Sequence, residues 1–200
     1  MPDREVRSRT VSTNGVDLHL LEAGREGPVV LLAHGFPELA YSWRHQLPAL
    51  AAAGYRAVAP DQRGYGRSSR PEALEDYDIH HLVGDLVGVL DDLDVSQAVV
   101  VGHDWGSMVA SHLALLHPER RRGLVNLSVP HLPRGDTAPI TAMRNVVGDM
   151  FFYILYFQEP GVADAELGGD PARTMRRMLA AAPPQPDAPL GPAWFANDGR

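Results

Sequence analysis

Three short, almost wholly apolar runs constrain what this chain can fold into more than any other feature. They are Pro28–Ala33, Ala57–Ala59 and Ala98–Val101. A strand with one face in water alternates apolar and polar residues, so a continuous apolar run is typical of a strand buried on both faces of a parallel sheet. Parallel strands need long crossover connections, which are usually helices. The runs therefore predict an α/β fold, a mainly parallel sheet with helices on its faces.

The stretches between these runs have the apolar spacing of helices. The periodicity predicts crossover helices over Trp43–Ala53, His81–Leu93 and Trp105–Leu116. The last of them is expected to end near His117-Pro118, because proline cannot continue a helix. Gly123–Val129 is then predicted to form one more strand.

The start of the chain favours an antiparallel hairpin. Val6–Thr13 and Val16–Leu21 flank Asn14-Gly15, a dipeptide that tolerates the positive φ angles of a tight turn. Together with the three buried runs and the later strand, the hairpin brings the predicted sheet to six strands. We therefore expect residues 1–133 to form the α/β core.

The pattern changes after Pro130. The alternation of strands and helices stops, and the helices predicted over Met143–Tyr156 and Arg173–Ala181 have no partner strands. Five prolines within Pro183–Pro192 exclude regular helix or sheet there, because proline lacks the amide donor, and favour an extended linker. Residues 134–200 are thus expected to form a helical insertion over the sheet or a second subdomain.

Composition excludes several classes of function. The chain has no cysteine, which excludes disulfides, thiolate metal sites and cysteine nucleophiles. Its net charge of −7 repels nucleic-acid phosphates. The nine histidines show no metal-ligand spacing such as H-E-x-x-H, so we expect no bound metal. Because no signal-type apolar region and no membrane span is evident, we expect a cytoplasmic protein.

The strongest functional signal is Gly102-His103-Asp104-Trp105-Gly106, between a predicted strand and a predicted helix. Glycines flank the centre because a sharp strand-to-helix turn leaves no room for side chains, and the turn presents the central side chain at the carboxyl end of the strand. Here that side chain is the carboxylate of Asp104. The same spacing also occurs in plain tight turns, so the motif alone leaves that alternative open.

A second signal, His34-Gly35-Phe36-Pro37, directly follows the first buried run. In a nucleophile-elbow fold, one oxyanion-hole amide comes from this loop and the other from the residue after the nucleophile. We therefore expect the amides of Phe36 and Trp105 to be the donors. His34 is interpreted as a packed histidine that holds the shape of the loop, since the backbone does the chemistry there.

With these motifs the chain resembles an epoxide hydrolase of the α/β-hydrolase fold, over nearly all of its 200 residues. Asp61–Ser68 matches the D-x-R-G-x-G-x-S loop of that superfamily, and Phe157–Ala163 resembles the lid signature of the epoxide-hydrolase branch. The resemblance implies that residues 134–200 are an incomplete helical lid. It also implies a cis peptide bond between Phe36 and Pro37.

The resemblance assigns a role to one lid tyrosine. In the family, a tyrosine a few residues before the lid signature polarises the epoxide oxygen, and the matching position is Tyr153, with Tyr156 as the second choice. Both tyrosines could instead pack the lid onto the core. In the functional interpretation, Asp104 attacks a saturated carbon and leaves an ester that water hydrolyses to a diol. The expected partners are a small epoxide and water, with no cofactor.

Two alternatives remain. A dehalogenase-type hydrolase shares the fold, the Asp nucleophile and often the following Trp, but a haloalkane dehalogenase typically has Asn at the position of Phe36 to bind halide. A fluoroacetate dehalogenase carries Arg at the position of Trp105. The family's second lid tyrosine, charge-relay acid and catalytic histidine lie downstream of the lid, and the sequence stops at Arg200. We therefore expect a fragment that cannot turn over alone or, as the second alternative, an inactive truncated remnant.

Overall fold

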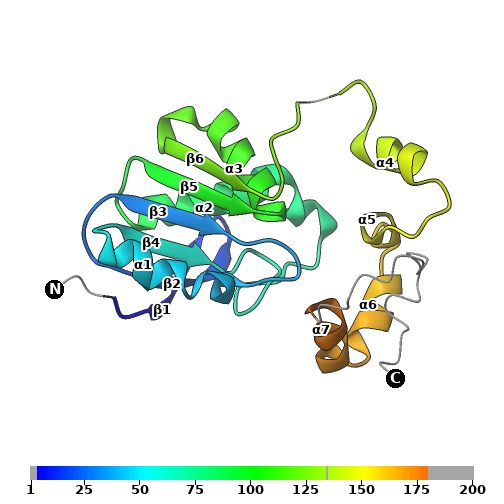
Figure 1. Cartoon of the computed structure of the whole chain (residues 1–200), viewed down its shortest axis with the longest axis horizontal. Coiled ribbons are helices and arrows are strands. Elements are labelled where there is room, and N and C mark those ends of the chain that lie inside the picture. The colour runs from blue at the N-terminus through cyan, green and yellow to red at the C-terminus, as the bar shows by residue number, and fades with distance from the viewer. Residues whose placement is uncertain (1–3, 134, 180–200) are drawn as a thin grey trace. The chain divides into compact units, whose positions relative to one another are not determined.

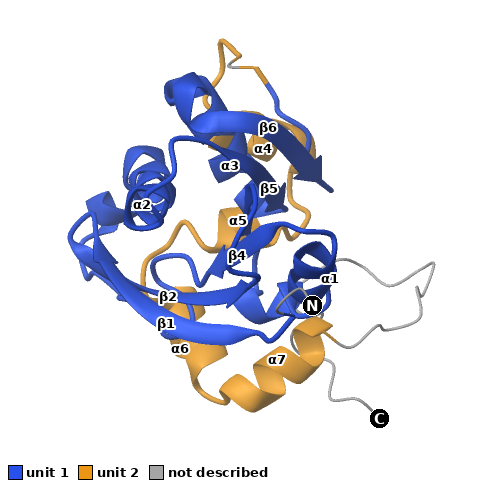
Figure 2. Ribbon diagram, turned by 90° about the vertical axis from the view of Figure 1, so that its left-hand side faces the viewer, with its two compact units in different colours: residues 1–132 blue, residues 133–200 orange. Residues whose placement is uncertain are grey.

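The computed structural model describes residues 4–133 and 135–179. The chain divides into two compact units, residues 1–132 and residues 133–200 (Figure 2). The proline-rich stretch Pro183–Pro192, for which an extended linker is predicted, lies outside the described residues.

A six-stranded sheet forms the centre of the first unit, with the strand order β1-β2-β4-β3-β5-β6 (Figure 1). The pairs β3/β4, β3/β5 and β5/β6 are parallel, whereas β1/β2 and β2/β4 are antiparallel. The mainly parallel sheet is thereby confirmed. The strands are β1 (Arg7–Thr13), β2 (Val16–Ala23), β3 (Val29–Ala33), β4 (Arg56–Pro60), β5 (Ala98–His103) and β6 (Arg121–Leu127).

The predicted hairpin at the start of the chain is confirmed. Thr13 of β1 pairs with Val16 of β2, and the two residues between them, Asn14 and Gly15, have φ angles of 50° and 77°. At the other edge, β6 lies two residues earlier than the predicted Gly123–Val129. It ends before Ser128, whose φ of 70° departs from extended geometry.

Helices cover both faces of the sheet, which explains the continuous apolar runs. In β3, Val29, Leu31 and Ala33 belong to one core cluster, whereas Val30 and Leu32 belong to another. The first cluster includes side chains of α2 (Ile79–Asp92) and α3 (Trp105–Leu116), and the second includes side chains of α1 (Gln46–Ala52). Each side of β3 is therefore buried under helices. Short 3-10 helices complete the unit: η1 (Ala40–Trp43), η2 (Leu74–Tyr77) and η3 (Pro118–Arg120).

The prediction of one helix over Trp43–Ala53 is wrong at its start. The segment forms η1 and then α1, which begins only at Gln46. The physical reason is Pro48, which is tolerated in the first turn of α1. In a helix beginning at Trp43, its ring would clash with the carbonyl of Arg44.

The second unit consists of four helices among its described residues: α4 (Pro139–Val147), α5 (Tyr153–Tyr156), α6 (Val162–Gly168) and α7 (Pro171–Leu179). The prediction of a single helix over Met143–Tyr156 is therefore wrong. Helix α4 ends at Gly148, whose φ of 59° is not helical, and α5 begins five residues later. Helix α6 lacks a counterpart in the sequence predictions, and α7 begins two residues before the predicted Arg173.

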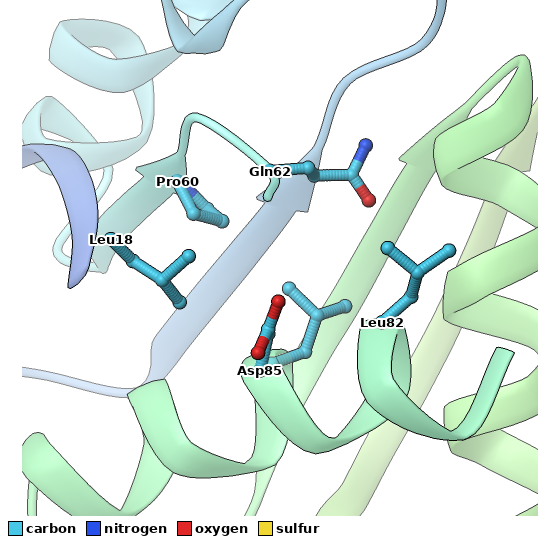
Figure 3. A pocket seen from close by; sticks show the side chains of 6 residues that line it. Leu18, Pro60, Gln62, Leu82 and Asp85 are labelled. Atoms are coloured by element: carbon cyan, nitrogen blue, oxygen red, sulfur yellow. The ribbon is translucent and has the colours of Figure 1, made fainter. Parts of the chain in front are cut away.

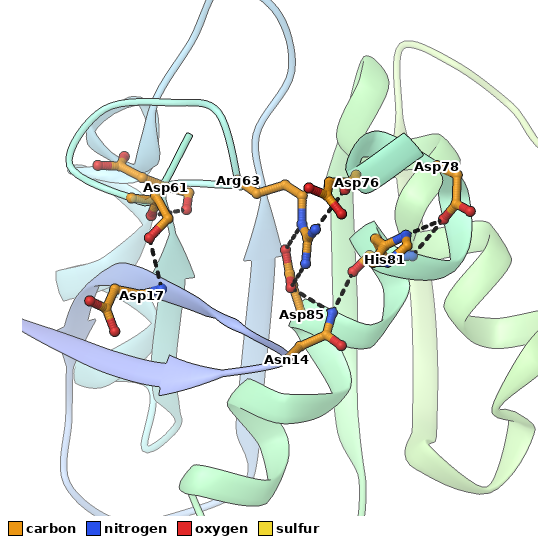
Figure 4. Close-up of polar contacts among 10 residues, drawn as sticks. Asn14, Asp17, Asp61, Arg63, Asp76, Asp78, His81 and Asp85 are labelled. Carbon is orange, nitrogen blue, oxygen red and sulfur yellow. Dashed lines mark hydrogen bonds and ion pairs between the residues drawn. The ribbon is translucent and has the colours of Figure 1, made fainter. Parts of the chain in front are cut away.

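A buried ion pair joins the loop after β4 to helix α2 (Figure 4). The guanidinium of Arg63 donates to both carboxylate oxygens of Asp85, at 2.7 and 2.6 Å, and to the carbonyl of Asp76 at 2.6 Å. The hairpin turn joins the same network, because Asn14 donates to Asp85 at 2.9 Å. The Arg63 and Asp85 side chains are only 2% and 4% exposed, so each depends on the other for its hydrogen bonds.

Packing beside this ion pair is close. A gap between the sheet and α2 is too narrow to hold a water molecule (Figure 3), and it is lined by Leu18, Pro60, Gln62, Leu82, Asp85 and Leu86. Asp85 is therefore closely packed on the side that faces this gap.

Replacing Asp85 by Ala is expected to lower the free energy of unfolding by about 3–5 kcal/mol, because Arg63 would remain buried without its counter-ion. The control is Asp91→Ala on the same helix, which removes a largely exposed partner of Arg120 and should cost about 0–1 kcal/mol. Urea unfolding followed by circular dichroism measures both changes. Equal losses for the two variants would contradict the structural role of the buried pair.

Strand β6 forms an open edge of the sheet among the described residues. Its side chains Val125 and Leu127 are 42% and 41% exposed, and an exposed apolar edge strand is a template for pairing with another chain. We expect the 200-residue chain to self-associate, with Val125→Lys plus Leu127→Lys shifting it toward monomer. Sedimentation velocity at several concentrations tests this, with Leu115→Lys on α3 as the control for added charge. A wild-type chain that stays monomeric at all concentrations would refute the expectation.

Candidate active site

Asp104 lies at a sharp turn between β5 and α3. Its φ and ψ angles are 53° and −121°, a conformation that costs energy for any residue except glycine. Strain of this kind agrees with the sharp strand-to-helix turn expected at Asp104. Two hydrogen bonds hold it: Asp104 donates its amide to the carbonyl of Leu127 at 3.2 Å, and its own carbonyl accepts the amide of Ser107 at 3.0 Å.

The loop after β3 packs directly against this turn. A Cβ atom added at Gly35 would lie 2.5 Å from Cβ of Asp104, and one added at Gly106 would lie 2.2 Å from the carbonyl oxygen of Ala33. At Gly102, an added Cβ would lie 2.3 Å from the carbonyl oxygen of Gly106. Each of these three glycines therefore stands where a side chain would clash with a neighbouring part of the loop or the turn.

The loop itself presents an amide to the Asp104 carboxylate. The peptide bond between Phe36 and Pro37 is cis, as predicted, and the amide of Glu38 donates to the carbonyl of Gly35 at 3.1 Å. In this turn the Phe36 amide donates to Oδ1 of Asp104 at 3.0 Å. Oδ1 of the carboxylate is thus held by one of the two amides that the sequence singles out, and the second candidate, the Trp105 amide, lies at the first residue of α3.

His34 connects the loop after β3 to the loop after β4. Its Nδ1 lies 2.8 Å from the carbonyl oxygen of Gly35, and its Nε2 accepts the amide hydrogen of Gln62 at 3.0 Å. Since Nδ1 must donate and Nε2 must accept, the ring is neutral with its proton on Nδ1. Burial lowers the pKa of His34, which agrees with this arrangement.

A further connection between the loop and the turn involves two residues that the sequence analysis did not single out. His103 Nδ1 lies 3.0 Å from Oε2 of Glu38, and His103 directly precedes Asp104. Both residues lie inside or beside the recognised motifs. The sequence alone could not have indicated that His103 and Glu38 meet, because the elbow pattern allows any residue before the nucleophile.

The two candidate tyrosines lie on α5 in the second unit. The hydroxyl of Tyr156 donates to the carboxylate of Glu166 on α6, and this hydrogen bond raises the pKa of Tyr156. The ring of Tyr153 instead makes edge contacts with Phe152 and Phe157, at centroid distances of 5.4 and 5.6 Å. The role of Tyr153 that the family resemblance implies stays a prediction.

A hollow of about 510 Å³ lies elsewhere in the first unit. It is lined by Asn14, Gly15, Val16, Arg63, Ser69, Arg70, Pro71, Asp76 and His81, and several of these residues are drawn in Figure 4. None of them belongs to the elbow or to the loop after β3.

Comparison with known proteins places this geometry in a family. A family described as alpha/beta hydrolase fold matches residues 28–193. The chain belongs to this family. The fold class expected from the sequence, an α/β-hydrolase fold with a mainly parallel sheet, is thereby confirmed.

Several relatives and solved structures similar to this chain are named as epoxide hydrolases. Epoxide hydrolase A of Mycobacterium tuberculosis (strain ATCC 25618 / H37Rv) is 64% identical over 90% of this chain and 56% of that protein. Epoxide hydrolase 1 of Siraitia grosvenorii is 47% identical over 96% and 61%. The crystal structure of Epoxide Hydrolase A from Mycobacterium thermoresistibile has a TM-score of 0.89 and 57% identity, over 96% of this chain and 63% of that one. The chain thus spans less than two thirds of each relative's length.

Acidification is expected to destabilise the fold through His34. Because burial lowers its pKa in the folded state, the unfolded chain binds the proton more readily, and stability is lost as the pH falls below the unfolded value of about 6.5. The variant His34→Gln should therefore lose less stability than the unmodified chain between about pH 7 and about pH 5. Urea unfolding at each pH measures the slope. An unchanged slope in His34→Gln would disprove the assignment.

Proposed function

We propose that this chain carries the residues for the first half-reaction of an epoxide hydrolase, in which the epoxide alkylates Asp104, the nucleophile. The observation that carries the proposal is the Asp104 carboxylate, held at the elbow by the Phe36 amide, in a chain 64% identical to a protein named Epoxide hydrolase A. The activity, substrate and partners of a whole protein of this kind belong to the same proposal, because the chain spans 56% of that relative.

The residue type at the elbow indicates the class of reaction. A serine that attacked a saturated carbon would form a stable ether, whereas a carboxylate forms an ester whose carbonyl carbon water can attack. With Oδ1 of Asp104 bonded to the Phe36 amide, Oδ2 is the attacking atom. Oδ1 then becomes the carbonyl oxygen, so the amides of Phe36 and Trp105 are the donors for the oxyanion formed during hydrolysis.

Ring opening also needs a proton donor. As the bond between Oδ2 and the epoxide carbon forms, the carbon–oxygen bond of the ring breaks, and the oxygen stays on the substrate as an alkoxide. Tyr153 is proposed to donate its hydroxyl proton to that oxygen, since a tyrosine with an ordinary pKa of about 10 is neutral at pH 7. Tyr156, whose hydroxyl donates to Glu166, stays the second choice.

Residues 133–200 are proposed to be the part of the lid that carries this tyrosine. The partners of the reaction are then a small epoxide and water. None of the helices in the described parts of the chain is long and apolar enough to cross a membrane. The dehalogenase alternative is not favoured, because the relatives given above are named as epoxide hydrolases and the Phe36 side chain has no donor for a halide ion.

Hydrolysis of the ester needs a base near Asp104. Among the residues that the structure describes, no histidine ring is hydrogen-bonded to the Asp104 carboxylate, and the neighbouring His103 is paired with Glu38. We therefore expect the ester to form in the 200-residue chain and to persist.

Incubation of the chain with a styrene-type epoxide is expected to add one molecule of epoxide, which intact-mass analysis detects and peptide mapping assigns to Asp104. The isosteric variant Asp104→Asn should remove the adduct. Tyr153→Phe should slow its formation by about 10²–10⁴-fold, the usual range for lost general acid catalysis. Tyr156→Phe is the matched control on the same helix and should react at nearly the wild-type rate.

Three outcomes would count against the proposal. An adduct that survives in Asp104→Asn would show that another carboxylate reacts. Equal rates for Tyr153→Phe and the wild type would remove Tyr153 from the mechanism. Multiple turnover to diol by the 200-residue chain would show that a histidine within it acts as the base.

A further inference from the structure

A second constellation with the chemistry of a nucleophilic site lies away from Asp104, at the hairpin edge of the sheet. Oγ of Ser8 on β1 lies 3.0 Å from Nε2 of His19 on β2, and Nδ1 of His19 lies 2.9 Å from Oδ2 of Asp61, just after β4. A hydroxyl, an imidazole and a carboxylate are thus connected in sequence, from three different segments of the chain. None of the proposed steps at Asp104 uses these residues.

The hydrogen bonds around Asp61 decide whether Nδ1 of His19 donates or accepts. Oδ1 of Asp61 accepts the amide hydrogen of Ala40 at 2.8 Å, and Oδ2 accepts that of Arg67 at 3.1 Å. The carboxylate therefore acts as an acceptor toward its neighbours, and Nδ1 of His19 donates to it. When the ring carries only this one proton, Nε2 is an acceptor for the Ser8 hydroxyl, 3.0 Å away.

The three residues differ in solvent exposure, and the difference suits reaction of Ser8 with a molecule from solvent. His19 and Asp61 are buried, at 7% and 4% exposure, so their orientation is fixed by packing. Ser8 is exposed, and a reagent can reach its hydroxyl from solvent. Strand β1 is also an outer strand of the sheet among the described residues, and such a strand presents backbone amides that are not used in pairing.

We propose that Ser8 is an activated nucleophile that accepts an acyl group from activated esters, with His19 as general base and Asp61 orienting the imidazole. An adjacent base in the correct tautomer is what makes a serine hydroxyl nucleophilic. The site is a place of covalent modification that is separate from the alkylation of Asp104.

The step is an acyl transfer. Oγ of Ser8 attacks the carbonyl carbon of the ester, and its proton passes to Nε2 of His19. The bond between the carbonyl carbon and the leaving oxygen then breaks, and His19 returns the proton to that oxygen, so an alcohol leaves and an acyl ester of Ser8 remains. The stoichiometry is one acyl group for each chain.

The sequence makes this step unusually easy to observe. The chain contains no lysine and no cysteine, so no amine or thiol side chain competes for the acyl donor. Ser12 supplies an internal control, because it is exposed on the same strand but donates to the carboxylate of Asp17 in place of an imidazole.

The test uses the full 200-residue chain with p-nitrophenyl acetate, with intact-mass analysis for the number of acetyl groups and peptide mapping for their positions. Acetylation of Ser8 is expected to be about 100-fold faster than that of Ser12, the low end of the usual range for general base catalysis. Ser8→Ala should remove the fast acetylation. His19→Gln should slow it to the rate of Ser12, and Asp104→Asn should leave it unchanged.

Because His19→Gln could disturb the fold, acetylation in urea provides a second comparison. Activation depends on the folded arrangement, so the ratio of the Ser8 and Ser12 rates should fall to about one in the unfolded chain. Equal rates for Ser8 and Ser12 in the folded chain would overturn the proposal. Fast acetylation of Ser8 that persists unchanged in urea would overturn it as well.

Discussion

The close approach of two backbones at the carboxyl end of the sheet is the constraint on which the candidate site depends. Strands β3 and β5 are parallel neighbours, with Ala33 paired to Gly102, so the loop that follows β3 meets the turn that follows β5. The distance between them leaves no room for a Cβ atom at Gly35 or Gly106. Because the two segments touch, the Phe36 amide can reach the Asp104 carboxylate, and the geometry of one segment fixes the other.

Buried polar groups hold the surrounding loops in register with the sheet. His34 bonds to Gln62 and thereby joins the loop after β3 to that after β4. Asp61 bonds to His19 and Ala40, and Arg63 bonds to Asp85 of α2. Each of these groups is buried and would be costly without its partner, so the loops have one well-defined arrangement. The D-x-R-G segment thus acts through buried hydrogen bonds to other parts of the first unit.

The two sites proposed for the first unit differ in their chemistry. At the elbow, a carboxylate beside backbone amides suits attack on a saturated carbon and the later stabilisation of an oxyanion. At the hairpin edge, a hydroxyl beside an imidazole suits attack on a carbonyl carbon. Both rest on the same loop after β4, because that loop carries Gln62 toward His34 and Asp61 toward His19. A change in the conformation of this loop would therefore alter both the elbow and the hairpin edge.

The sequence by itself determined the sheet, the hairpin and the elbow. Runs such as Val29–Ala33 can only be buried on both faces, Asn14-Gly15 suits a tight turn, and the glycines around Asp104 permit a strained strand-to-helix turn. The sequence did not determine where the helices begin and end. The apolar periodicity continues through Pro48 and Gly148, but these residues set the limits of α1 and α4. Periodicity averages over a window, whereas a helix ends at a single residue.

Only the tertiary structure decided which polar side chains meet. Ser8, His19 and Asp61 come from three segments separated by up to 53 residues in number, and nothing in their local sequence connects them. The same holds for Glu38 with His103, and for the donation of the Tyr156 hydroxyl to Glu166. Local patterns follow from the geometry of one helix or strand, but a side-chain hydrogen bond depends on the packing of several elements, which is fixed only when the whole core forms.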